Sequence, residues 1–236
     1  MTILGSRTHR REKLFPWFLL ATLLPLLVMP FTNLEGNAVQ RLLLPSTTLV
    51  LVVLALQIAP EGRFRFGRVS WLPIYRLLGI LCAILMWLPM IRGQHVPHQW
   101  HFPILAVISA FYGATVSMIV LILSQVDRVN ERVLCLGAAG YIHLGLTGGQ
   151  FATALEVLRP GSFSLGHMLP GQELVERLSY FAFVTLGSLG YGDVLPKTAI
   201  AESFTVLLSL SGTLYVTLMI GLLLSRYIAS EVESGE

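Results

Sequence analysis

The sequence predicts an all-α membrane protein, with six transmembrane helices and a short re-entrant helix between the fifth and the sixth. The first observation is composition: 54% of the 236 residues are hydrophobic and only 12% are charged, whereas a soluble domain carries about 25% charged residues. The second is a series of apolar runs long enough to cross a bilayer. The third is an apolar stretch too short to cross, followed by a glycine-rich run.

The apolar runs give the elements in order. A crossing helix needs about 20 residues, and six runs are close to or above that length: 14–31, 42–59, 71–91, 102–123, 133–155 and 200–228. The first contains Pro16, Pro25 and Pro30, so we expect a kinked helix whose freed carbonyls are satisfied by neighbouring helices. Residues 174–186 are apolar but too short to span, which predicts the re-entrant helix.

These runs divide the chain into regions. We expect a basic N-terminal tail at 1–13, a four-helix transmembrane domain at 14–123, a linker at 124–132, a domain containing the fifth and sixth spans at 133–228, and a C-terminal tail at 229–236. Almost no length is left for a water-soluble domain. Cys82 and Cys135 both lie in apolar runs and give neither a disulfide framework nor a metal motif.

The basic residues indicate the orientation. With a cytoplasmic N-terminus, ten basic residues flank the spans on the inner side and four on the outer side, with Arg76 and Arg177 left unassigned. The inner ones are Arg7, Arg10, Arg11, Lys13, Arg63, Arg65, Arg68, Arg128, Arg132 and Arg226, and the outer ones are Arg41, Arg92, Arg159 and Lys197. This excess follows the positive-inside rule. We therefore expect a multi-pass protein of the cell membrane with both tails and the linker in the cytoplasm, and no nucleic-acid partner despite the net charge of +3.

The stretch after the short helix has the composition of a backbone ligand site. Glu173 and Glu176 begin the helix, where carboxylates complement the positive end of its dipole, and its C-terminus near Thr185 directs partial negative charge at the run. Gly190 and Gly192 permit backbone angles closed to other residues, so the run can turn its carbonyls toward one line. Irregular backbone at membrane depth is tolerated only inside protein or beside a watery cavity. The unit therefore predicts a cavity that favours a cation.

The pattern Thr185-x-x-Ser188-x-Gly190-Tyr191-Gly192-Asp193 resembles the filter signature of potassium channels, Thr-Val-Gly-Tyr-Gly-Asp. This family is the standard example of a carbonyl-lined filter, and the likeness covers roughly the last hundred residues. The resemblance implies a bacterial-type, six-span potassium channel whose pore domain (outer helix, turret, pore helix, filter and inner helix) occupies 133–228. Backbone carbonyls and the Ser188 hydroxyl would replace the hydration shell of K⁺. The residues implied to bind the ion are Ser188, Leu189, Gly190, Tyr191 and Gly192.

The resemblance also implies how many copies assemble, and it leaves open which residue bonds the filter aspartate, Asp193. Only one such signature occurs in the chain, and a ring of carbonyls needs four, which implies a homotetramer. Ser188 stands where Thr is usual and lacks a packing methyl, and Gly187 stands where a small polar residue is common. Val184 replaces a Glu that bonds the filter aspartate in some relatives, so Asp193 needs another partner, and we expect Tyr180 to supply it. The expected filter supports are Tyr180, Thr185 and Asp193.

The fifth and sixth spans contain glycines and leucines for which the sequence allows two structural roles each. Gly212 lies twenty residues after Gly192, the place of a gating hinge in many family members; a helix-packing contact is the alternative. Either reason would offset the roughly 1 kcal/mol that a mid-helix glycine costs relative to Ala. Leu222–Leu224 near the cytoplasmic end form a hydrophobic constriction or face lipid. The fifth span predicts close packing against the sixth span or a neighbouring subunit, through Gly137, Gly140, Gly145, Gly148 and Gly149.

The first four spans lack the voltage-sensor pattern. Residues 103–123 contain no basic side chain, and several charges are needed for steep voltage gating, so we predict no such response. The four spans then brace the pore, or sense a ligand or lipid. His95, His98 and His101 are interface residues or an outer pH or metal sensor. His143 in the fifth span is a hydrogen-bonded packing residue or a proton relay.

The sequence therefore predicts a passive, potassium-selective channel. It predicts no enzyme, because the spans contain no paired carboxylates, Ser/His pair or His–Glu metal motif, and no cofactor beyond permeant K⁺. The expected partners are three further copies of the chain and the lipid bilayer. Two alternatives stay open: a weakly selective monovalent cation channel, because of Gly187 and Ser188, and a non-conducting membrane sensor or partner subunit that keeps the pore fold.

Overall fold

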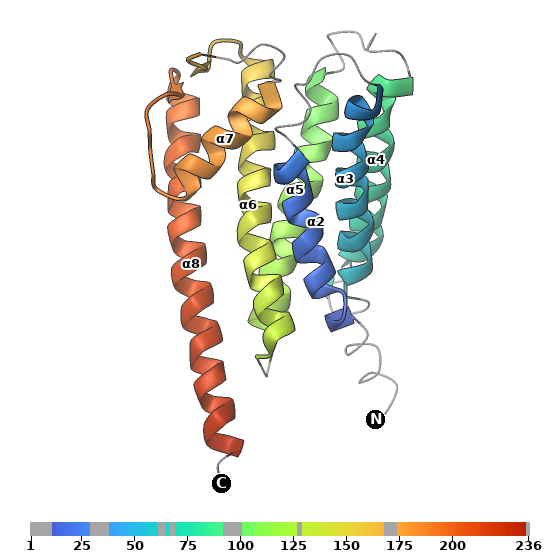
Figure 1. The fold of residues 1–236 in the computed structure, drawn as a ribbon, viewed down its shortest axis with the longest axis vertical. Helices are drawn as coiled ribbons and strands as arrows, with labels where there is room; N and C mark the ends of the chain where they lie inside the picture. The colour runs from blue at the N-terminus through green and yellow to red at the C-terminus, as the bar shows by residue number, and fades with distance from the viewer. Residues whose placement is uncertain are drawn as a thin grey trace.

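The computed structural model describes residues 11–28, 38–60, 65–66, 69–91, 101–126, 129–167 and 174–234. Within these ranges, long helices lie side by side, and the short helix α7 lies between α6 and α8 near one end (Figure 1). The helices are α2 (Phe15–Val28), α3 (Ala38–Ile58), α4 (Trp71–Ile91), α5 (His101–Ser124), α6 (Glu131–Leu158), α7 (Leu174–Leu186) and α8 (Ala199–Ser234). Two antiparallel pairs of short strands join β1 (Arg65–Phe66) to β2 (Val69–Ser70) and β3 (Phe163–Ser164) to β4 (Leu195–Pro196).

The helices follow the predicted runs closely. The predicted bounds 71–91 and 174–186 coincide with α4 and α7, and the largest difference is α8, which continues to Ser234. In the described ranges, three helices are long and apolar enough to cross a membrane, namely Trp71–Leu88, Phe102–Ser124 and Ala199–Arg226, and two shorter apolar helices are Phe15–Val28 and Pro45–Ile58. The protein is thus mostly helical with three candidate spans, consistent with an all-α membrane protein, and the six crossings stay a prediction.

Some predicted features fall outside the described residues. These are Pro30, Glu173, His95 and His98, the side chain of His101, whose backbone begins α5, and several basic residues used for the orientation, which are Arg7, Arg10, Arg63, Arg68, Arg92, Arg128 and the side chains of Arg41 and Arg65. The region 156–173, whose sequence is polar and rich in turn-forming residues, contains strand β3. Its partner β4 lies more than thirty residues further along the chain, after the glycine-rich run. Local sequence patterns did not predict this pairing.

Helix α6 is central to the fold, because it packs against α2, α5, α7 and α8. Its residue His143 is fully buried and stacks on Tyr112 of α5, with ring centroids 4.8 Å apart and planes at 15°. Phe18 of α2 lies on the same ring at 6.0 Å. Within the described chain, neither ring nitrogen of His143 has a hydrogen-bond partner. The side chain is therefore a packing residue, and the Tyr112 backbone is the polar group closest to a hydrogen bond with it.

Two of the α6 glycines form the surface against which α7 packs. Gly145 lies directly against the ring of Phe183, and Gly149 lies against Ser179. A Cβ added at Gly149 would stand 2.7 Å from the Cα of Ser179, which is far inside van der Waals contact. Small residues let membrane helices approach this closely, so α7 can lie against the α6 backbone.

Other α6 glycines receive α8, as the sequence predicts. An added Cβ at Gly148 would lie 2.8 Å from a methyl carbon of Leu208. Below this contact, the Tyr215 hydroxyl donates a 2.9 Å hydrogen bond to the carbonyl of Gly137 and lies directly on Gly140. The prediction of packing against the sixth span is confirmed, and α7 is an additional partner that was not foreseen.

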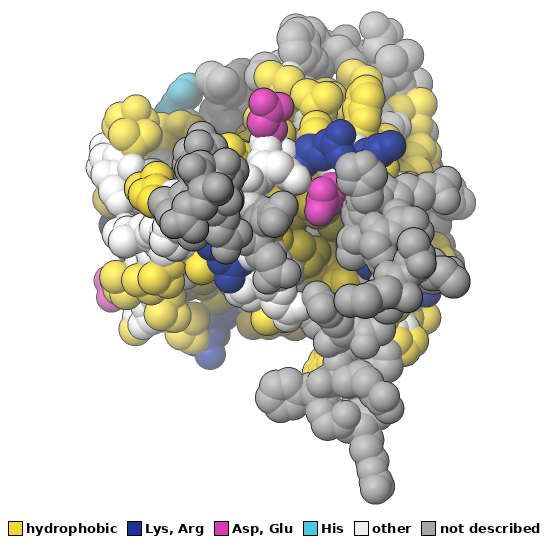
Figure 2. Space-filling view, turned by 90° about the horizontal axis from the view of Figure 1, so that it is seen from below, with side chains coloured by type: hydrophobic (Ala, Val, Ile, Leu, Met, Phe, Trp, Pro, Cys, Tyr) yellow, Lys and Arg dark blue, Asp and Glu magenta, His cyan; other side chains and the backbone are white. Residues whose placement is uncertain are grey.

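The start of α2 and the end of α8 lie at the end of the molecule away from α7 (Figure 1). At this end Asn130 caps the N-terminus of α6 and donates to the Glu12 carboxylate at 3.3 Å. Arg226 of α8 donates to the carbonyls of Leu123 and Ser124, at 3.3 and 2.9 Å, where α5 ends. Figure 2 shows this end face, on which Lys and Arg side chains stand among hydrophobic ones, some beside acidic side chains. Charged groups thus gather where the sequence places the cytoplasmic flanks.

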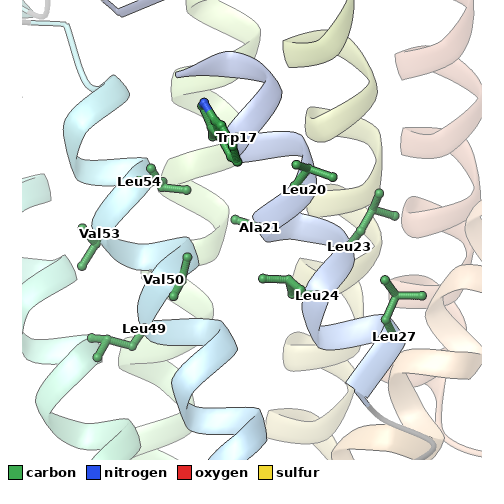
Figure 3. A pocket seen from close by; sticks show the side chains of 10 residues that line it. All are labelled: Trp17, Leu20, Ala21, Leu23, Leu24, Leu27, Leu49, Val50, Val53 and Leu54. Carbon is green, nitrogen blue, oxygen red and sulfur yellow. The ribbon is translucent and has the colours of Figure 1, made fainter. Parts of the chain in front are cut away.

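An apolar hollow lies between α2 and α3 (Figure 3). It is lined by Trp17 and nine aliphatic side chains, which are Leu20, Ala21, Leu23, Leu24, Leu27, Leu49, Val50, Val53 and Leu54. Among the described residues, its lining contains no carboxylate, hydroxyl or basic group. Trp17 is 63% exposed, as expected for a surface that faces acyl chains.

The contact between α6 and α7 gives a testable prediction. We expect Gly149→Ala to lower thermal stability, because overpacking of this kind costs about 1–3 kcal/mol and the obstructing atom is backbone. Gly113→Ala is the matched control: its Cβ would lie 3.7 Å from the Phe151 ring, and the helix gains about 1 kcal/mol from alanine. Thermal unfolding followed by tryptophan fluorescence measures both. Equal stabilisation by the two substitutions would show that α7 does not lie this close to α6.

Candidate functional site

The glycine-rich run has an unusual alternating backbone. Ser188, Gly190 and Gly192 have φ of 58°, 57° and 78°, whereas Leu189 and Tyr191 between them do not have positive φ. Alternation of left- and right-handed residues turns successive amides to one side and successive carbonyls to the other. A Cβ at Gly190 or Gly192 would meet nothing within 4 Å, so the backbone angle is what requires glycine there. At Ser188 the same conformation costs about 1–2 kcal/mol, and such strain is typical of functional sites.

Three amides of the run, those of Ser188, Leu189 and Gly190, are bound to the end of α7. The amides of Ser188 and Leu189 donate to the carbonyls of Thr185 and Val184 at 3.0 and 2.9 Å. The amide of Gly190 donates to Val184 at 3.4 Å. The last carbonyls of a helix have no partner inside it, so α7 supplies these acceptors without losing its own bonds. The carbonyls of the run are therefore directed away from α7.

The hydrogen bonds also mark where the free carbonyls begin and end. Before the run, the carbonyl of Leu186 accepts from the Tyr141 hydroxyl at 3.3 Å. After it, the carbonyl of Asp193 accepts from Arg177 at 3.3 Å. Between them, no donor within the described residues reaches the carbonyls of 188–192. Backbone carbonyls require a partner, and for this run the available partners are water or a cation.

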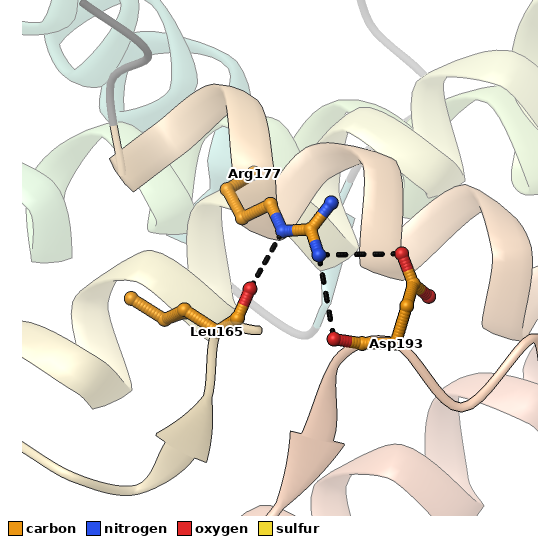
Figure 4. Close-up of polar contacts among 3 residues, drawn as sticks. All are labelled: Leu165, Arg177 and Asp193. Atoms are coloured by element: carbon orange, nitrogen blue, oxygen red, sulfur yellow. Dashed lines mark hydrogen bonds and ion pairs between the residues drawn. The ribbon is translucent and has the colours of Figure 1, made fainter. Parts of the chain in front are cut away.

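Arg177 is the ion-pair partner of Asp193 (Figure 4). Its Nη2 lies 3.3 Å from the Asp193 carboxylate, and its Nε donates to the carbonyl of Leu165 at 2.8 Å. Sequence reasoning left Arg177 unassigned; the available signal was a lone basic residue in a short apolar helix that precedes the aspartate.

Tyr180, the expected partner of Asp193, lies in the same group. The guanidinium of Arg177 stands 5.3 Å from the centre of its ring. Partial burial and, after it, a hydrogen bond to Asp193 raise the pKa of the Tyr180 hydroxyl. The side chain is 38% exposed in the single chain. Tyr180 is therefore close to the aspartate, while Arg177 makes the ion pair.

The segment between α6 and α7 braces the far end of the run. Strand β3 pairs with β4 just beyond Asp193, and the amide of Lys197 donates to the carbonyl of Ser162 at 2.7 Å. The Glu156 carboxylate accepts from the amides of Gly161 and Phe163 at 2.7 and 2.9 Å. This carboxylate closes the turn from which β3 starts, so the run is held from both α7 and β3.

Gly212 lies against the other end of the run. An added Cβ there would collide with the carbonyl oxygen of Leu186 and stand 2.9 Å from its side chain. Helix α8 continues unbroken through this position. The close approach gives a packing reason for the glycine, and a hinge at the same residue stays a prediction.

The structure brings most of the predicted site residues together. Tyr180, Thr185 and residues 188–193 surround the end of α7, and Gly212 contacts Leu186 beside them. The described residues contain no group of His, Cys, Asp and Glu fit to hold a metal. His143 lies in the packed core away from this region. Of the leucines near the end of α8, Leu224 is exposed and the side chain of Leu223 lies outside the described residues.

Comparison with known proteins gives one family match. Residues 163–229 match a family model described as an ion channel. The match begins at β3 and includes α7, the glycine-rich run and most of α8, which are the elements that form the site. No curated protein and no solved structure matched the chain. The match supports an ion channel and, together with the apolar helices, a membrane protein.

The two readings of Gly212 make opposite predictions for stability. If the contact with Leu186 is required, Gly212→Ala lowers thermal stability by about 1–3 kcal/mol through overpacking. If the residue is only a hinge, alanine stabilises the helix by about 1 kcal/mol. We expect the loss. Gly221→Ala, where a Cβ meets nothing within 4 Å, is the control on the same helix, and tryptophan fluorescence on heating measures both. A stability gain at both positions would leave the hinge as the reason.

Proposed function

We propose that the protein is a potassium-selective channel in which four copies surround a pore lined by Ser188-Leu189-Gly190-Tyr191-Gly192. The observation that carries the proposal is the run of carbonyls without protein donors, held by the alternating backbone of Ser188, Gly190 and Gly192. Carbonyl oxygens presented in a row can replace the hydration shell of K⁺. The side chains contribute packing, and the ion ligands are backbone oxygens and the Ser188 hydroxyl.

Assembly from four copies follows from what one chain lacks. A single chain carries one such run, and a filter of this type needs four. The side chains of Leu189 and Tyr191 are 60% and 66% exposed, which is unfavourable for large apolar groups unless other copies cover them. Exposed apolar side chains continue along α8, at Val206, Leu207, Leu210, Leu214 and Leu218. These surfaces supply the interface between copies.

The electrostatics fit a cation path. Each Asp193 is paired with Arg177, so the end of the run is not a ring of four bare carboxylates, and selectivity falls to the carbonyls. With the termini in the cytoplasm, the run lies toward the outer side of the cell membrane. Helix α5 has no basic residue beyond its first turn, so conduction is passive and lacks voltage gating through that helix.

Ion flux from purified protein in liposomes tests the proposal. We expect K⁺ efflux from the wild-type protein, with far lower Na⁺ flux. Gly190→Ala should lower K⁺ flux about tenfold or more, because alanine at positive φ costs about 1–2 kcal/mol in each of four chains. Gly221→Ala, on the open face of α8, should conduct normally.

The other outcomes correspond to the alternatives. Equal K⁺ and Na⁺ flux would identify a weakly selective channel, and it would point to Gly187 and Ser188 at the inner end of the run. Absence of flux from folded, assembled protein under varied voltage and pH would favour a non-conducting sensor or partner subunit.

A further inference from the structure

Arg177 is the one basic residue of α7, and its side chain is only 12% exposed. Its guanidinium makes three contacts with two separate segments. Nε donates to the Leu165 carbonyl, and Nη2 contacts both the carboxylate and the backbone carbonyl of Asp193. The planar guanidinium fork suits several acceptors at fixed angles better than the single ammonium of lysine. Figure 4 shows the side chain between the two segments.

The contact with the backbone of Asp193 bears on the ion path. The run of free carbonyls stops at Gly192 because the next carbonyl, that of Asp193, is turned toward Nη2 of Arg177 at 3.3 Å. Without this donor, the Asp193 carbonyl has no partner recorded within the described residues. The peptide that follows Gly192 could then rotate, and glycine at φ 78° offers little resistance to rotation.

The second segment is 162–166, which contains β3 and the two residues that follow it. Gly166 (φ 61°) lies so close that an added Cβ would collide with the carbonyl oxygen of Asp193 and stand 3.1 Å from Nη2 of Arg177. Leu165, the residue before it, is the acceptor for Nε. Arg177 therefore joins the exit of the run to the loop 162–166, which is itself tied to Lys197 beyond β4.

From these contacts we propose that Arg177 is a positioning residue of the filter: it fixes the carbonyl of Asp193 away from the pore axis, sets Gly192 as the outermost ligand and couples the loop 162–166 to the ion path. This inference rests on the proposed channel function. It assigns a specificity-determining role to a residue that touches no ion.

The test is K⁺ binding to the full-length assembled protein. Ions that bind only the folded state raise its melting temperature in a concentration-dependent way, so the rise with KCl, against choline chloride, reports the affinity without flux. We expect Arg177→Gln to need about tenfold more K⁺ for the same rise, the loss of one charge-assisted contact. The K⁺ over Na⁺ preference in liposome flux should fall as well. A purely structural role would lower the melting temperature equally at all K⁺ concentrations.

Lys197→Gln is the matched control: it removes one positive charge from the same end of the molecule, and among the described residues Lys197 bonds only through its backbone amide. Identical K⁺ titrations for Arg177→Gln and Lys197→Gln would overturn the inference. If Arg177→Gln does not fold, Arg177→Lys and Asp193→Asn replace it. Both keep part of the contact set and should shift the titration by a smaller factor, and a wild-type titration from both would also overturn it.

The two proposals fail in different ways. Wild-type protein whose melting temperature ignores K⁺ and which passes no K⁺ would reject the channel function itself. Wild-type protein that responds to K⁺, with Arg177 variants that respond identically, would reject only the role of Arg177.

Discussion

The site depends on four hydrogen bonds between the amides of 187–190 and the last carbonyls of α7. These bonds pair two sets of backbone groups that would otherwise lack partners. A helix ends with carbonyls that lack acceptors of their own kind, and a non-helical segment at membrane depth has amides that need partners. Once these amides are bound to α7, the carbonyls of 188–192 remain without a donor among the described residues and can serve a ligand. The proposed cation site would thus be a consequence of how α7 ends.

The position of α7 depends in turn on glycines, which have no side chain, in α6 and α8. Gly145 and Gly149 let α7 lie on the α6 backbone, and Gly212 lets Leu186 lie on α8. Membrane helices associate through close packing, because lipid is as apolar as the side chains. Three glycines on two helices therefore fix the short helix from two sides, and the alternating run follows at a defined place.

Much of this could be predicted because it is local. Helices α4 and α7 follow from apolar runs, and the glycines at 190 and 192 follow from a short pattern that also resembles a known filter. The support of Asp193 was not predictable in the same way. Tyr180, expected from its spacing, does lie beside Asp193, but the ion pair with Arg177 was not expected, and the other acceptor of Arg177 is the carbonyl of Leu165. That acceptor lies in a loop whose path depends on β3 pairing with β4, a long-range contact that residue types do not encode.

Helix α5 is linked to α8 by hydrogen bonds from Arg226, which the sequence of α5 does not predict. Arg226 donates to the carbonyls of Leu123 and Ser124, where the dipole of α5 places partial negative charge. If the end of α8 moved away, these two carbonyls would lose their donors, and the arginine would lose a favourable electrostatic environment. Moving either α8 or α5 away from the other would therefore break the same Arg226 hydrogen bonds. This contact links α5 to α8 at the end of the molecule opposite α7, and α5 is itself packed on α6 and α4.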